Sequence, residues 1–154
     1  MQFETYSEQA RRVIFFARYE ASNLGASKIQ ATHLVLGLLR ESKAMFLRLK
    51  VPPGKLVLIR EACVKAGSGQ ASISVSVDMP LDKDAVVIIK RASDEMRNRT
   101  HKKVDVEHLL LAALHVQSKA RSILRRQGLD YEPVSKILFK PRLADSAGDA
   151  LDYT

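Results

Sequence analysis

The sequence holds one cysteine, Cys63, and this scarcity already narrows the class of protein. A single thiol cannot form an internal disulfide, so nothing in the chain indicates an oxidising compartment. Tryptophan is absent, and aromatic residues make up only 6% of the sequence. Leucine, alanine, arginine, lysine and glutamate are abundant instead, and these residues favour helices over sheets. We therefore expect an all-α fold.

Long apolar runs are missing as well. No stretch approaches the ~18 consecutive apolar residues of a membrane span, and the N-terminus lacks the basic start and apolar core of a secretory signal. Apolar residues nevertheless make up 46% of the 154 residues, which is ample to bury a core. The sequence thus predicts a soluble, globular, cytoplasmic protein with no membrane partner.

Motifs of catalysis and metal binding are equally scarce. The sequence has no Gly-x-x-x-x-Gly-Lys-Ser/Thr phosphate loop, no His-Glu-x-x-His motif and no cysteine pair. His33, His108 and His115 are spaced too widely for a dense ligand set, and Cys63 is predicted to be a buried thiol. We expect a protein that is no enzyme and that uses neither a metal nor a cofactor.

The chain is built on a duplication. Residues 31–39 (Ala-Thr-His-Leu-Val-Leu-Gly-Leu-Leu) return seventy-five positions later as residues 106–114 (Val-Glu-His-Leu-Leu-Leu-Ala-Ala-Leu). Apolar residues follow each histidine, His33 or His108, at the spacing of a buried helix. Because the histidine recurs at the same place, we predict that it makes a structural hydrogen bond and does not bind a metal.

Each copy lies within a set of four predicted helices. Apolar spacing, capping residues and breakers predict helices at about 7–24, 31–39, 43–50 and 55–66, and again at about 82–99, 106–114, 118–127 and 130–139. Repeat one therefore covers about 3–66 and repeat two about 81–139. Residues 67–80 form the linker, with an extended segment at 72–77, and residues 142–154 are predicted to be a flexible tail.

The first helix of each repeat presents the same buried face. Its apolar positions in repeat one recur seventy-five places later in repeat two: Ala10, Val13, Ile14, Ala17 and Ala21 become Ala85, Ile88, Ile89, Ala92 and Met96. We expect Glu20 to face water, and Gly37 to let another helix approach closely. Phe15 and Phe16 are predicted to pack against a neighbouring helix, with an exposed binding patch as the alternative.

Several of these residues occur together in a known family. The first helix begins Ser7-Glu8-Gln9-Ala10, where the family has Thr-Glu-Arg-Ala, and continues to Glu20-Ala21 and Leu24-Gly25. The two histidine motifs correspond to the family's Gly-Thr-Glu-His-Ile-Leu-Leu-Gly-Leu. Together with the duplication, these residues resemble the Clp N-terminal domain of Clp/Hsp100 unfoldases, in particular its ClpC branch. The resemblance covers about residues 3–139, within a domain expected at 1–141.

The resemblance implies one compact domain of about eight helices in two pseudo-symmetric four-helix repeats. It also implies a non-catalytic, monomeric protein-binding module that receives substrates or adaptors for an ATP-driven unfoldase. The expected partners are a Clp ATPase, its ClpP protease, or their substrate and adaptor proteins. If the chain is complete, it resembles stand-alone Clp N-domain proteins such as plastid ClpT, which act as accessory or decoy partners. If it is a fragment, its parent is the unfoldase.

The ClpC resemblance also implies a binding site. In such domains the motif glutamate of each repeat helps to bind phosphoarginine, because a carboxylate pairs with the guanidinium while a helix N-terminus receives the phosphate. Here the second repeat keeps that residue as Glu107, flanked by Val106 and His108. The matching place of the first repeat is Ala31-Thr32-His33, which supplies no negative charge. We therefore predict at most one site, at Glu107, with a favourable acid in the first helical turn as the alternative interpretation.

The formal net charge of +8 supports a different function. Basic clusters gather in the second repeat, namely Lys90-Arg91, Arg97-Asn98-Arg99, His101-Lys102-Lys103 and Arg125-Arg126. A contiguous face of such residues would attract nucleic acid or an acidic partner surface. No aromatic residues are interleaved to stack on bases, so ordinary solvated helix faces are the simpler interpretation.

Overall fold

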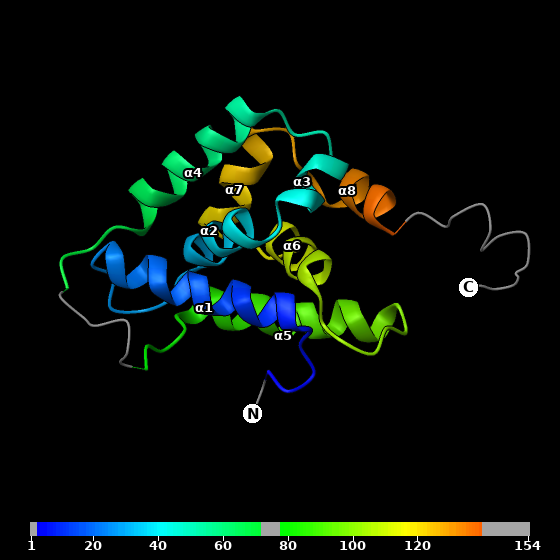
Figure 1. The fold of residues 1–154 in the computed structure, drawn as a ribbon, viewed down its shortest axis with the longest axis horizontal. Coiled ribbons are helices and arrows are strands. Elements are labelled where there is room, and N and C mark those ends of the chain that lie inside the picture. Colours follow the sequence, from blue (N-terminus) through cyan, green and yellow to red (C-terminus); the bar gives the residue numbers. More distant parts are fainter. Residues whose placement is uncertain (1–2, 72–77, 140–154) are drawn as a thin grey trace, which may run out of the picture.

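The computed structural model describes residues 3–71 and 78–139, and every regular element in these ranges is an α-helix (Figure 1). In chain order the helices are α1 (Glu8–Asn23), α2 (Ala31–Glu41), α3 (Lys43–Arg48), α4 (Pro53–Gly67), α5 (Lys83–Asn98), α6 (Val106–His115), α7 (Lys119–Arg126) and α8 (Tyr131–Leu138). The predicted all-α fold of two four-helix repeats is confirmed. The extended segment expected at 72–77 and the tail expected at 142–154 lie outside the described residues.

The two helices of the repeated motif, α2 and α6, form the centre of the domain (Figure 1). All residues of α2 from 31 to 38 are buried, and in α6 only Glu107 and His115 are not. Helices that are apolar on every side must be covered on every side. Accordingly, α1 and α5 lie on one side of this pair, and α3, α4, α7 and α8 lie on the other, around one continuous core.

Gly37 brings α1 and α2 unusually close together, as its size predicts. A Cβ atom built on Gly37 would overlap the carbonyl oxygen of Val13 and lie 3.2 Å from the backbone nitrogen of Ala17. Both contacts are with the backbone of α1, which cannot move aside as a flexible side chain can. The packing of the first repeat therefore requires a residue without a side chain at this position.

The two repeats are joined by crossed backbone pairs. The residues before α1 pair with those before α6, through hydrogen bonds from Ser7 N–H to Val104 C=O and from Val104 N–H to Thr5 C=O, both 2.9 Å long. The symmetry-related bonds run from Ile29 N–H to Pro80 C=O and from Asp82 N–H to Ile29 C=O, also at 2.9 Å. Each repeat thus satisfies backbone groups of the other.

One buried glutamate in each repeat links the first helix of that repeat to other helices, which corrects the prediction that Glu20 faces water. Glu20 is only 3% exposed, because Arg40 of α2 and Arg60 of α4 reach its carboxylate at 3.4 and 3.3 Å. Its counterpart Glu95 is 2% exposed and accepts a hydrogen bond of 2.6 Å from the Tyr131 hydroxyl at the start of α8. The polarity of the sequence predicts that such acids face water, whereas ion pairs with arginine side chains allow them to be buried.

Ionisation of Glu95 depends on those partners. Burial alone would raise its pKa, but the hydrogen bonds from Tyr131 and Arg91 and the charges of Arg91 and Arg99 outweigh burial, and the pKa is lowered. The carboxylate is therefore charged in the folded protein. Its ion pairs are with Arg91 of α5 and Arg99 at the end of α5, and it connects α5 to α8 through the hydrogen bond that the Tyr131 hydroxyl donates to it.

The prediction for Phe15 and Phe16 holds only in part. Phe15 is 49% exposed and is not covered by a neighbouring helix, so the expected packing is wrong for this residue. Phe16 is half-buried, and the guanidinium of Arg40 lies 4.5 Å from its ring centroid. One ring of the pair is thus available at the surface of α1.

We predict that Gly37→Ala lowers the free energy of unfolding by about 1–3 kcal/mol, because the new methyl group must push α1 away from α2. Gly54→Ala is the matched control, since a Cβ at this helical glycine meets nothing within 4 Å. That control should be neutral or stabilising by up to about 1 kcal/mol, owing to the better helix propensity of alanine. Urea denaturation measures both changes, and equal effects would contradict the close contact.

Candidate functional site

Each histidine of the repeated motif closes the first turn of its own helix. Nδ1 of His33 accepts a hydrogen bond from the Gln30 N–H at 2.9 Å, and Nδ1 of His108 accepts one from the Asp105 N–H at 2.8 Å. With Nδ1 as the acceptor, each neutral ring carries its proton on Nε2. Nε2 of His33 donates to the Gly67 carbonyl at 2.8 Å, at the end of α4. The predicted structural hydrogen bonds are confirmed.

His108 belongs to a cluster of rings at the end of α8. Its Nε2 lies 2.8 Å from Nδ1 of His101 and donates to it. Both imidazoles pack against Phe139, with ring centroids 5.4 and 5.5 Å away. Burial, and then the neighbouring His101, lower the pKa of His108 to about 4. The motif histidine is therefore neutral at physiological pH.

Only Glu107 reaches the surface among the residues predicted to bind phosphoarginine. Val106 is 3% exposed, and both ring nitrogens of His108 are engaged in the hydrogen bonds just described. The Glu107 carboxylate accepts a hydrogen bond of 3.1 Å from the Arg48 guanidinium, which comes from α3 of the other repeat. Arg48 also donates to the Leu138 carbonyl at 3.1 Å. An internal guanidinium thus occupies the carboxylate that a ligand would use.

The matching place in the first repeat is closed. Ala31, Thr32 and His33 are all buried, with Thr32 only 2% exposed. The Thr32 hydroxyl oxygen has no hydrogen-bond partner among the described residues. These three residues offer neither an accessible surface nor a charge to a ligand.

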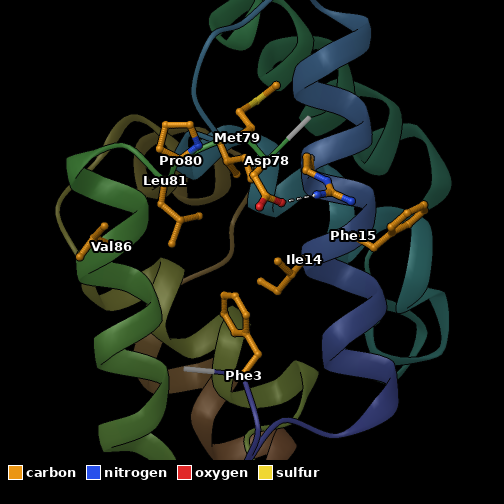
Figure 2. A pocket seen from close by; sticks show the side chains of 10 residues that line it. Phe3, Ile14, Phe15, Asp78, Met79, Pro80, Leu81 and Val86 are labelled. Carbon is orange, nitrogen blue, oxygen red and sulfur yellow. Dashed lines mark hydrogen bonds and ion pairs between the residues drawn. The ribbon is translucent and has the colours of Figure 1, made fainter. Parts of the chain in front are cut away.

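An apolar hollow lies between α1 and α5 (Figure 2). Its volume is about 490 Å³, and its apolar lining includes Phe3, Ile14, Met79, Pro80, Leu81 and Val86. Phe3, Ile14 and Leu81 point into the space, whereas the ring of Phe15 at its rim points away. We call this hollow the α1–α5 groove. It is an apolar recess of the size that takes one or two side chains of a bound segment.

The α1–α5 groove is a product of the crossed backbone pairs. Leu81 and Ile29 form one of those pairs and both line the groove, while Phe3 precedes the other pair. At the end of the groove next to the linker, the Arg18 guanidinium and the Asp78 carboxylate form an ion pair of 3.4 Å. Sequence reasoning missed this site because its residues come from segments that meet only when the repeats cross. The single signal available was the apolar Phe15, which was named as an alternative binding patch.

Four of the eight lysines and arginines in the basic clusters of the second repeat pair with the chain's own acids. Arg91 and Arg99 both contact Glu95, at 2.6 and 3.3 Å. Arg97 pairs with Asp94, and Arg125 lies 3.7 Å from Asp130. The arginines of these clusters therefore contribute less free positive charge than the sequence indicates.

The described residues give little support to a metal site or to a reactive thiol. No three side chains of the types His, Cys, Asp and Glu gather there as a metal site needs. Cys63 is fully buried, and burial raises the pKa of its thiol to about 12, which keeps it unreactive. No helix of residues 3–71 and 78–139 is long and apolar enough to cross a membrane.

We predict that His108 makes the protein less stable in acid. Its pKa of about 4 lies below the ordinary value of 6.5, so the unfolded state takes up the proton first as the pH falls. The stabilisation by the neutral ring is complete above pH 6.5 and is lost toward pH 4, by up to about 3 kcal/mol. In His108→Asn an amide oxygen can replace the Nδ1 acceptor without titrating. Urea denaturation from pH 7 to 4.5 should show a flatter pH profile for this variant, and identical profiles would contradict the prediction.

The sequence has relatives among proteins of known family. Residues 5–127 match the Clp repeat (R) N-terminal domain. An ATP-dependent Clp protease ATP-binding subunit ClpA homolog of Cyanidium caldarium is 29% identical over 131 residues, which are 83% of this chain and 15% of that protein. The chloroplastic chaperone protein ClpC of Pisum sativum is 28% identical over 131 residues, or 83% of this chain and 14% of that protein. The chain thus spans about 15% of the length of the curated relatives it matches.

Solved structures show the same fold. The Hsp104 N-terminal domain from Candida albicans superposes with a TM-score of 0.75 at 17% identity, covering 89% of this chain and 91% of that one. The N-terminal domain of ClpD from Arabidopsis thaliana gives a TM-score of 0.66 at 22% identity, covering 89% and 94%. The duplicated histidine motif, the eight helices and the family match over residues 5–127 agree with one another. The chain belongs to the Clp N-terminal domain family.

Proposed function

We propose that this domain is a non-catalytic protein-binding module that receives segments of substrate or adaptor proteins for a Clp unfoldase. The observation that carries the proposal is the α1–α5 groove, with its apolar lining and a volume of about 490 Å³. The proposed partners are a Clp ATPase, its ClpP protease and their substrates or adaptors. In this role the monomeric domain modulates or feeds the protease.

The groove suits an unfolded segment better than a small polar molecule. Phe3, Ile14 and Leu81 offer apolar surface to an inserted side chain, and burial of one large apolar side chain stabilises a complex by about 1.5–3 kcal/mol. Unfolded proteins expose such side chains, whereas folded proteins mostly bury them. Several weak insertions of this kind allow a chain to be held and then passed on. Phe15, half exposed at the rim, extends the apolar surface beyond the groove.

We predict that Phe3→Asp weakens the binding of an unfolded polypeptide at least about tenfold, because the apolar contact is lost and a charge must enter the groove. Ile137→Asp is the matched control, since Ile137 is an exposed apolar residue on α8, outside the groove. Fluorescence anisotropy with labelled, reduced and carboxymethylated α-lactalbumin measures both affinities. Equal losses in the two variants would refute the groove as the site. Binding that disappears at high salt in the wild type would favour the alternative, charge-driven function toward nucleic acid or an acidic partner.

We also propose that Glu107 is the single phosphoarginine site of this chain. The proposal is supported by the guanidinium of Arg48, which the Glu107 carboxylate already binds at 3.1 Å. Arg48 is half exposed, so a ligand guanidinium can displace it at modest cost. His108 then positions Glu107 by fixing the first turn of α6.

Calorimetric titration with phosphoarginine tests this site. Arg48→Gln should bind up to about fivefold more tightly than the wild type, because the competing ion pair of an exposed side chain is gone. Glu107→Ala should abolish binding. Arg97→Gln, which breaks the exposed pair with Asp94, is the control and should leave the affinity unchanged. Equal heats for the wild type and Glu107→Ala would rule the site out.

A further inference from the structure

A second hollow, between α4 and α7, carries three positive side chains. Lys65 comes from α4, and Lys119 and Arg126 come from α7; with the Ser122 hydroxyl they line a space of about 470 Å³. The other lining residues are apolar, and two of them, Ala62 and Ala66, are small enough to keep the space open. No acidic side chain of the described residues lines this hollow. We call it the α4–α7 hollow.

The cations of the α4–α7 hollow have no partner among the described residues. The side chains of Lys65, Lys119 and Arg126 form no ion pair or hydrogen bond there, which holds for the other described lysines as well. Arg126 is the one arginine in the described ranges of which this is true, since even Arg11 and Arg121 donate to backbone carbonyls. Three like charges around one recess repel one another, and an anion in the recess relieves that repulsion.

The charges of the α4–α7 hollow are only partly repeated in the other half of the domain. The turns that end α3 and α7 match at a spacing of seventy-eight residues, because the bond from Val51 N–H to Phe46 C=O recurs from Leu129 N–H to Leu124 C=O. At this spacing Arg126 corresponds to Arg48, whereas Lys119 corresponds to Glu41. The positive charge of Lys119, on the helix that faces α4 of the first repeat, is therefore particular to the second repeat.

We propose that the α4–α7 hollow binds a compact anion made of linked phosphate groups. Every charged group in the lining is a cation that donates hydrogen bonds, which suits phosphate oxygens, whereas the Ser122 hydroxyl already donates to the Ser118 carbonyl at 3.4 Å. Lys119 and Arg126 are seven residues apart on α7, or about 10 Å along the helix, and Lys65 faces them from α4. Negative charge distributed along a short phosphate chain matches this spread better than one carboxylate does. Such a chain is supplied by inorganic polyphosphate or by the polyphosphate end of a nucleotide.

Calorimetric titration of the full chain with inorganic tripolyphosphate tests the proposal. We expect one saturable site, weakened about fivefold by Arg126→Gln and abolished by the triple variant Lys65→Gln/Lys119→Gln/Arg126→Gln. The triple variant Lys28→Gln/Lys83→Gln/Lys102→Gln removes the same charge from exposed lysines elsewhere and should bind within about twofold of the wild type. Ala62→Leu fills the hollow without changing charge and should also abolish the saturable site. Thermal unfolding of each variant shows that it is folded.

The source of the phosphates is read from two further probes, ATP and adenosine. Equal affinity for tripolyphosphate and ATP indicates recognition of the phosphate chain alone, whereas tighter binding of ATP indicates a nucleotide; adenosine should not bind. The proposal is overturned if the two triple variants lose equal affinity, or if Ala62→Leu binds as the wild type does. It is likewise overturned if only a DNA strand or polyglutamate binds and tripolyphosphate does not. None of these outcomes bears on the α1–α5 groove, so the proposed function is tested separately.

Discussion

The crossed backbone pairs are the constraint on which the rest of this domain depends. Tyr6 pairs with Val104, and Leu81 pairs with Ile29, so the segment that leads into the first helix of each repeat is held by the other repeat. The Ser7 hydroxyl, which caps α1, also donates to the Asp105 carboxylate, which caps α6, at 2.8 Å. Buried backbone groups must be paired, and each repeat depends on the other to hydrogen-bond these backbone groups of its connecting segments. The duplication is therefore a structural necessity as well as a sequence pattern.

This crossing also produces the surface that we propose for function. It brings Phe3, from the start of the chain, and Leu81, from its middle, to one groove between α1 and α5. The core beneath is held rigidly by Gly37 and by the buried carboxylates of Glu20 and Glu95, each paired with arginines. A rigid core with an apolar recess at its seam suits repeated binding of unfolded segments, since the site is formed before the ligand arrives.

The sequence predicted the helices well, because their apolar period depends on local residues alone. It failed where a residue's environment depends on distant partners. Glu20 is polar and was assigned to water, but Arg40 and Arg60 arrive from two other helices to pair with it. Phe15 is apolar and was assigned to a helix contact, yet no helix covers it. The apolar period is a property of one helix, whereas the burial of a side chain depends on every helix that packs around it.

The same reasoning explains what could be predicted of the sites. Glu107 could be predicted because it lies inside the repeated motif. Its ion pair with Arg48 joins the two repeats, so the sequence of neither repeat alone indicates it. The α1–α5 groove and the α4–α7 hollow are both formed across repeats, so neither could be read from one stretch. The repeat comparison does help afterwards. It shows that Arg126 has a basic counterpart in Arg48, whereas Lys119 stands where the first repeat has Glu41.

The most direct test of the central claim is a two-dimensional NMR titration of the ¹⁵N-labelled chain with an unfolded polypeptide, such as reduced and carboxymethylated α-lactalbumin. The account predicts that the amide signals of Phe3, Ile14, Leu81 and Val86 shift together and saturate with one affinity. Signals of α4 and α7 should stay in place. Shifts confined to the basic residues of α7, with none in the α1–α5 groove, would contradict the account.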